Sequence, residues 1–205
     1  MLALMVAGTM AACNDPKGTV ENDSLAEATP DSAVVYEDER GALEADGLEV
    51  EEVDEAFWND IDWEAPVVED PELKEAEVEK RATKEYNIYL MDEHPMFDTD
   101  KAEIRPEGVE KLQEVVNEIK QLPTKGQIRI FGFTDARASK EYNEKLSAER
   151  AKSVQNWLIE KGGIDAARLS MEPMGESAPR ATNETPRGRQ LNRRVAIVVV
   201  TKEKV

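Results

Sequence analysis

The sequence predicts a two-layer α/β domain in which helices pack on one face of a mixed β-sheet. Three observations favour this fold class. From residue 86 onward, strand-like and helix-like apolar patterns alternate, two long helical stripes separate the strands, and the last apolar run suits a buried strand. The chain has 205 residues, which is enough for one such domain and its appendages.

The first half of the domain is predicted to contain a strand, a helix and a second strand. Residues 87–91 have the pattern of a strand, and Pro106 opens a helix whose apolar residues recur at helical spacing as far as Pro123. Residues 127–133 alternate, with two isoleucines on one face and two phenylalanines on the other. This alternation indicates a second strand.

The second half of the domain is predicted to contain a long helix and two more strands. Ser139 can cap the helix, which is expected to end at Gly162 and Gly163. Residues 168–173 suggest a third strand, and residues 195–201 form an apolar run typical of a well-buried final strand.

The N-terminal segment has a lipoprotein-type pattern. Residues 1–12 contain no charge and lead directly to Cys13. Residues 1–13 resemble a bacterial lipoprotein signal peptide, in which small residues precede a cysteine that is lipidated, with palmitate for example, after cleavage. A secretory signal with a chance cysteine is the alternative. A permanent membrane span needs about 20 apolar residues, so this segment is too short for one.

Negative charge is concentrated in one part of the chain. The net charge is −18, and residues 14–79 hold 24 Asp and Glu against three Lys and Arg. This segment would repel a polyanion, so no nucleic-acid partner is predicted. Residues 14–69 are predicted to form a mostly disordered tether, because acidic residues repel one another and large apolar residues are sparse.

Two features stand out near the end of the predicted tether. Asp70 and Pro71 suit an N-cap and a first helical position, which predicts a short helix over residues 70–85 leading into the domain at 86–205. Large apolar side chains also interrupt the acidic run, namely Phe57, Trp58, Ile61 and Trp63. They fit either a docking motif for a partner protein or a local contact with the folded domain.

Asp135 and Arg150 are candidate site residues because of their positions. The strand over 127–133 delivers Asp135 just past its end, next to the start of the second helix. Arg150 falls on the apolar stripe of that helix, where an unpaired guanidinium would be costly. We therefore expect Asp135 and Arg150 to make contact. From spacing alone, an ordinary ion pair between helix and loop is the simpler interpretation.

A resemblance to a known family changes that interpretation. The motifs FDTD, GFTD, YNxxLSxxRA, GE and NRRV occur in this order at residues 97–100, 132–135, 142–151, 175–176 and 192–195. Together they resemble the OmpA-like C-terminal domain, the peptidoglycan-binding module of outer-membrane proteins and of peptidoglycan-associated lipoproteins. The resemblance implies that Asp135 and Arg150 grip the free end of diaminopimelate in a peptidoglycan stem peptide. It also implies a pocket completed by Thr99, Asp100, Asn143 and Arg193.

The implied chemistry agrees with the residue types. The free end of diaminopimelate carries an ammonium and a carboxylate on one carbon, so a carboxylate and a planar guanidinium are its complements. Asn143 lies two helical turns before Arg150, and its amide is expected to give the ligand a further hydrogen bond. The family commonly has glycine where this chain has Ala138, which would reshape the loop if that position requires a positive φ.

The sequence thus predicts a non-enzymatic protein that tethers the outer membrane to the cell wall through a lipid anchor, with its domain in the periplasm. Other envelope proteins are expected partners. No cofactor or metal is predicted, because the single histidine, His94, offers neither a triad nor a metal cluster.

Two alternatives stay open. A flagellar stator-type wall anchor uses a similar domain after a transmembrane helix. The other is a cell-wall hydrolase, which would need a catalytic acid pair outside the binding motif, or an accessory protein of such an enzyme.

Overall fold

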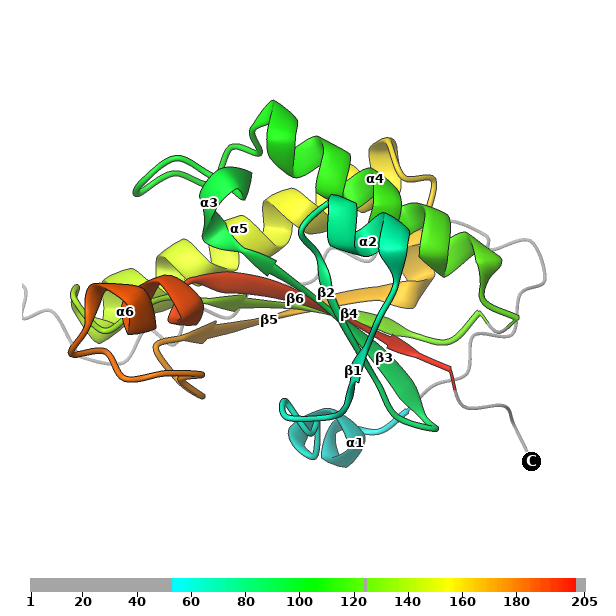
Figure 1. Cartoon of the computed structure of the whole chain (residues 1–205), viewed down its shortest axis with the longest axis horizontal. Helices are drawn as coiled ribbons and strands as arrows, with labels where there is room; N and C mark the ends of the chain where they lie inside the picture. Colours follow the sequence, from blue (N-terminus) through cyan, green and yellow to red (C-terminus); the bar gives the residue numbers. More distant parts are fainter. Residues whose placement is uncertain (1–52, 124, 202–205) are drawn as a thin grey trace, which may run out of the picture. The chain divides into compact units, whose positions relative to one another are not determined.

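The computed structural model describes residues 53–123 and 125–201, which belong to one compact unit, Ala42–Val205. Its centre is a six-stranded sheet in the order β1-β2-β3-β6-β4-β5 (Figure 1). Only β4 and β5 are parallel neighbours in this sheet, so it is mixed, as predicted. The strands are β1 Val67–Val68, β2 Glu79–Ala82, β3 Tyr86–Asp92, β4 Ile128–Phe133, β5 Leu169–Gly175 and β6 Arg194–Val200.

The long helices form the second layer. Figure 1 shows α4 and α5 on one face of the sheet and α1 on the other. The helices are α1 Glu55–Asn59, α2 Pro71–Glu75, α3 Glu93–Met96, α4 Pro106–Gln121, α5 Lys140–Glu160 and α6 Pro186–Asn192, with a 3₁₀ turn at Ala166–Arg168. The predictions of four strands and two long helices are confirmed by β3, β4, β5, β6, α4 and α5. No helix in the described part of the chain is both long and apolar enough to cross a membrane.

Close packing of α5 on the sheet positions the loop after β4. A side chain on Gly132 would place its Cβ only 2.3 Å from the carbonyl oxygen of Ser147, so the helix and strand can approach this closely only at a glycine. Ser139 Oγ accepts a hydrogen bond from the Tyr142 amide at 3.2 Å and caps the helix, as predicted. The end of β4 therefore lies beside the first turns of α5.

The end of α5 also follows the prediction. Gly163 has φ +66°, a left-handed conformation that costs glycine little. The amides of Gly162 and Ile164 donate to the carbonyls of Trp157 and Leu158, both at 3.0 Å. These bonds give a hydrogen-bond donor to backbone carbonyls that would otherwise have none at the end of the helix.

Part of the predicted tether is folded. Trp58 and Ile61 are buried against the sheet face that α4 and α5 leave uncovered, and the Trp63 ring meets Phe131 and Phe133 edge-on at 5.1 and 5.2 Å. The aromatic cluster is thus a local contact with the domain. The prediction of a tether is wrong for residues 53–69, and residues 14–52 lie outside the described residues.

Arginines on the sheet explain why this acidic segment can fold. Arg129 pairs with Glu55 through both η nitrogens, at 2.8 and 2.7 Å, and its guanidinium lies over the Trp58 ring. Arg81 pairs with Glu64 and donates to the backbone next to it. Buried aromatic area together with paired carboxylates outweighs the charge repulsion that the composition suggests.

The helix predicted over residues 70–85 is also shorter than expected. The Asp70 carboxylate caps α2 as predicted, but the helix ends at Glu75, and Glu77 adopts φ +53°. Residues 79–82 then pair with β3 as strand β2. The backbone groups of β3 would otherwise be unpaired on that side, and this requirement outweighs helix propensity.

Candidate functional site

The strand register brings three segments of the chain together at one end of the sheet. Asp92 at the end of β3 pairs with Arg194 at the start of β6, and Arg194 pairs with Phe133 at the end of β4. The residues just beyond this row are Glu93, Arg193 and the loop after β4. Charged groups from distant parts of the sequence therefore meet here.

A pocket of about 320 Å³ lies at this place. It is bounded by α3, the loop after α3, the loop after β4 and the first half of α5. All six residues predicted from the sequence to form the pocket line it: Thr99, Asp100, Asp135, Asn143, Arg150 and Arg193. Cys13, predicted as the lipidation site, lies outside the described residues.

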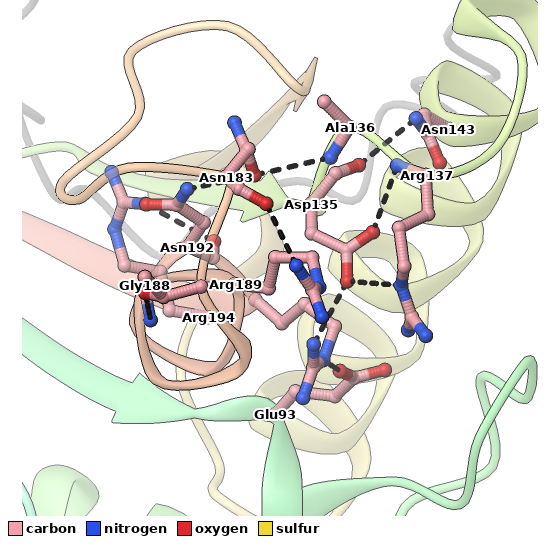
Figure 2. Close-up of polar contacts among 12 residues, drawn as sticks. Glu93, Asp135, Ala136, Arg137, Asn143, Asn183, Gly188, Arg189, Asn192 and Arg194 are labelled. Carbon is pink, nitrogen blue, oxygen red and sulfur yellow. Dashed lines mark hydrogen bonds and ion pairs between the residues drawn. The ribbon is translucent and has the colours of Figure 1, made fainter.

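Asp135 is buried at one end of the pocket and has two arginine partners. Its Oδ2 accepts hydrogen bonds from Arg193 Nη1 at 2.8 Å and from Arg137 Nε at 2.9 Å, and its Oδ1 accepts one from the Arg137 amide at 3.1 Å (Figure 2). Burial alone would raise the pKa of Asp135, but these bonds outweigh it and hold the pKa below its ordinary value. The carboxylate is therefore ionised at neutral pH.

Asn143 supports Asp135 from the first turn of α5. Its Nδ2 donates to the carbonyl oxygen of Asp135 at 3.0 Å and to Glu176 Oε2 at 3.0 Å. The NH₂ group thus holds the loop, and the expectation that the amide also serves the ligand stays a prediction. Ala138 is not among the described residues with positive φ, so the alanine fits this loop without strain.

Arg150 is enclosed at the other end of the pocket, with 2% of its surface exposed. Its Nε donates to the carbonyl oxygen of Lys101 at 2.9 Å, its Nη2 forms an ion pair with Glu93, and its guanidinium lies 5.2 Å from the centre of the Phe97 ring. A buried guanidinium needs such partners, as its place on the apolar stripe predicts.

The expected direct contact between Asp135 and Arg150 is wrong. Among the contacts of the described residues, the two are linked through a chain of charges, in which Glu93 pairs with Arg150 and Arg193, and Arg193 pairs with Asp135. The physical reason is that Glu93, from the end of β3, reaches Arg150 from the side of the sheet. The alternation of charges leaves each of these buried groups with an opposite neighbour.

Comparisons with known proteins identify the family. A family model described as the OmpA family matches residues 96–193. Outer membrane protein A of Bordetella avium is 32% identical over 160 residues, which cover 73% of this chain and 78% of that protein. This chain belongs to the OmpA family.

Other relatives agree with this assignment. The probable lipoprotein YiaD of Escherichia coli K12 is 36% identical over 114 residues, which make up 55% of this chain and about half, 51%, of that protein. The structure of the cell wall anchor of the T6SS from Pseudomonas aeruginosa is 29% identical, with a TM-score of 0.57 over 64% of this chain and 92% of that one. The OmpA-like fold predicted from the sequence is thus confirmed.

The rest of the pocket in this OmpA-family domain is lined by some residues that the sequence predicts and by some that it does not. Thr99 and Asp100 belong to the loop after α3, and Asp100 has φ +57°. Desolvation, followed by the Asp100 carboxylate, raises the pKa of Tyr142, an exposed residue that lines the same pocket. Thr134 Oγ1 is buried and has no hydrogen-bond partner among the described residues, so a ligand in the pocket can bond to it.

Sequence reasoning did not assign five charged or polar lining residues to the site: Glu93, His94, Thr134, Arg137 and Tyr142. One signal could have found Glu93, because it follows an apolar strand in the same way that Asp135 does. Within the described ranges, no group of three or more His, Cys, Asp and Glu side chains could hold a metal ion.

Proposed function

We propose that this domain binds peptidoglycan non-covalently through the diaminopimelate end of a stem peptide, and that it thereby ties the outer membrane to the cell wall. The observation that carries the proposal is a pocket with an ionised carboxylate, Asp135, at one end and a guanidinium, Arg150, at the other. A group that carries an ammonium and a carboxylate on one carbon complements both ends. Relatives named as an outer membrane protein and a cell wall anchor support this role.

In this proposal each polar group of the pocket has a defined task. The ligand ammonium binds Asp135, and the ligand carboxylate binds Arg150. The buried hydroxyl of Thr134, which lacks a partner among the described residues, gives the ligand a hydrogen bond. The role is binding and positioning, and we propose no catalytic step.

Pull-down with purified peptidoglycan tests the site. Asp135→Asn keeps the shape of the side chain but removes its charge, so the ligand ammonium loses its partner in a buried place. We expect binding to weaken about 30-fold or more, the equivalent of roughly 2 kcal/mol. Asp60→Asn is the matched control, because Asp60 is exposed and follows α1 on the other face of the sheet. It should bind as the unmodified chain does.

The ligand is tested with soluble stem peptides. A peptide with diaminopimelate should bind more tightly than the same peptide with lysine, because lysine has the side-chain ammonium but no carboxylate beside it for Arg150. Unchanged pull-down by a folded Asp135→Asn variant would refute the site assignment. Equal binding of the two peptides would refute the diaminopimelate end as the recognised group.

We further propose that Cys13 carries the lipid anchor and that residues 14–52 connect it to the domain. The support comes from the lipoprotein-type segment 1–13, the acidic composition after it, and a relative described as a probable lipoprotein. A random coil of 39 residues would span roughly 30–40 Å, which is the reach that this proposal assigns to the connection.

Labelling with a radioactive or clickable palmitate tests the anchor. Cys13→Ser should abolish incorporation of the label and release the protein from the membrane fraction, while the peptidoglycan pull-down stays unchanged because the pocket is intact. Labelling that persists in Cys13→Ser would exclude this cysteine as the attachment point.

A further inference from the structure

Glu93 is a carboxylate inside the pocket that nothing in the family motifs identifies. It is the first residue of α3, and its side chain is 12% exposed. One oxygen pairs with Arg150 Nη2 and the other with Arg193 Nε. A carboxylate of the chain thus already occupies the guanidinium at which the proposed ligand carboxylate must bind.

The geometry of a guanidinium determines where a ligand carboxylate would meet Glu93. A carboxylate binds arginine through two parallel bonds, either end-on to Nη1 and Nη2 or side-on to Nε and Nη2. Nε already donates to the Lys101 carbonyl, which leaves the end-on fork of Nη1 and Nη2 for a ligand. Nη2 has no hydrogen-bond partner among the described residues, but Glu93 lies against it as an ion-pair partner. A ligand carboxylate on the end-on fork would therefore meet the like charge of Glu93 beside Nη2, and its binding favours withdrawal of Glu93.

Apart from the ion pair between them, Arg150 has more anchors than the Glu93 side chain has. Arg150 is fixed by helix α5, by the Lys101 carbonyl and by contact with the Phe97 ring. Glu93 lines the pocket, and rotation of its side chain can release Arg150 while its second oxygen keeps the ion pair with Arg193. The displaced carboxylate thus retains a cation.

We propose that Glu93 is a specificity-determining residue that competes, as an internal carboxylate, with the ligand for Arg150. This inference rests on the proposed peptidoglycan-binding function. A pocket with Glu93 on Arg150 binds a carboxylate ligand poorly because the two anions repel each other, and the apparent affinity falls with the fraction of molecules in that state. A ligand with an ammonium alone cannot displace Glu93, because it brings no anion to replace it. Glu93 therefore lowers affinity and restricts the pocket to ligands that carry both charges.

The test is the Kd of the full chain and of Glu93→Gln for a stem tripeptide with diaminopimelate, measured by calorimetry. Glutamine can still accept a hydrogen bond from Arg150, but without the charge the contact is weaker and the ligand displaces it more easily. We expect Glu93→Gln to bind the diaminopimelate peptide about tenfold more tightly. The gain should be absent for the matched lysine peptide.

A charge control separates competition from a general field effect. Asp98→Asn removes a negative charge from an exposed residue close to the pocket that does not line it. It should leave the affinity within about twofold, because exposed charges are screened. An equal gain in Asp98→Asn would overturn the proposal.

The other outcomes are also decisive. If the unmodified chain binds the diaminopimelate peptide and folded Glu93→Gln binds it equally or more weakly, Glu93 is not a competitor, while the proposed function stands. If neither binds, the proposed function fails, and this inference fails with it. If Glu93→Gln does not fold, Glu93→Asp keeps the charge on a shorter side chain, and the same selective gain is expected from its weaker reach to Arg150.

Discussion

The two ends of the pocket present opposite, buried charges but differ in how exposed the partners Arg137 and Glu93 are. At the acidic end, Asp135 shares its carboxylate with Arg137, whose side chain is 62% exposed. At the basic end, Arg150 is 2% exposed and is paired with Glu93, which is itself largely buried. Exchange of Arg137 for a ligand ammonium replaces a solvated partner, whereas exchange of Glu93 for a ligand carboxylate replaces a desolvated one. The basic end should therefore control affinity.

The difference arises from the elements that carry the residues. Arg150 is part of the apolar stripe of α5, so it belongs to the core as well as to the pocket. Asp135 lies in the loop after β4, where Asn143 and Arg137 hold it by hydrogen bonds. A change at the basic end should therefore affect folding and binding together, and a change at the acidic end should affect mainly binding.

Stability measurements should show the largest contrast between the ends. Arg150→Ala leaves Glu93 with one cation fewer and opens a hole in the core, so we expect a loss of about 3–5 kcal/mol in the free energy of unfolding. Asp135→Ala leaves Arg193 still paired with Glu93 and Arg137 in water, and should cost about 1–2 kcal/mol. Urea unfolding followed by circular dichroism measures both values.

Lys152→Ala is the matched control for this comparison. Lys152 is exposed on the same helix as Arg150, and alanine favours a helical conformation. The free energy of unfolding of the Lys152→Ala variant should therefore differ from that of the unmodified chain by less than about 0.5 kcal/mol. If Asp135→Ala lost as much stability as Arg150→Ala, the two ends would be equally structural and the comparison would not hold. For the same reason, loss of binding in Asp135→Asn is easier to interpret than loss in Arg150→Ala.

The predictable part of the fold is the part in which apolar residues repeat regularly. The alternation in β4 predicts a strand and the four-residue stripe of α5 predicts a helix; β4 leads into the loop with Asp135, and α5 carries Arg150. The loop residues Thr99 and Asp100 could be placed only through the family resemblance, because no periodicity relates them to α5. The local apolar pattern therefore predicts the strand and the helix that support the pocket, and the spacing of the motifs predicts which residues line it.

The missed features depend on contacts between residues far apart in sequence. The segment 53–65 folds because the sheet offers Phe131 and Phe133 as an apolar surface and Arg129 as a cation, which composition alone does not show. Strand β2 is rich in charged residues and was assigned to a helix, since only β3 specifies its pairing. The contact between Glu93 and Arg150 likewise follows from the register of β3, β6 and β4.

Arg137 offers the smallest and most selective test of the comparison. In the free pocket it occupies Asp135 Oδ2, where the ligand ammonium is proposed to bind, but its exposure keeps that ion pair weak. Arg137→Ala should therefore leave the Kd for a diaminopimelate peptide within about threefold of the value for the unmodified chain. Any change should be toward tighter binding, and it should be seen at low salt, where the ion pair is screened least. Calorimetry at two salt concentrations measures this effect. A large loss of affinity in Arg137→Ala would make Arg137 a ligand contact, and the acidic end would then be as restrictive as the basic end.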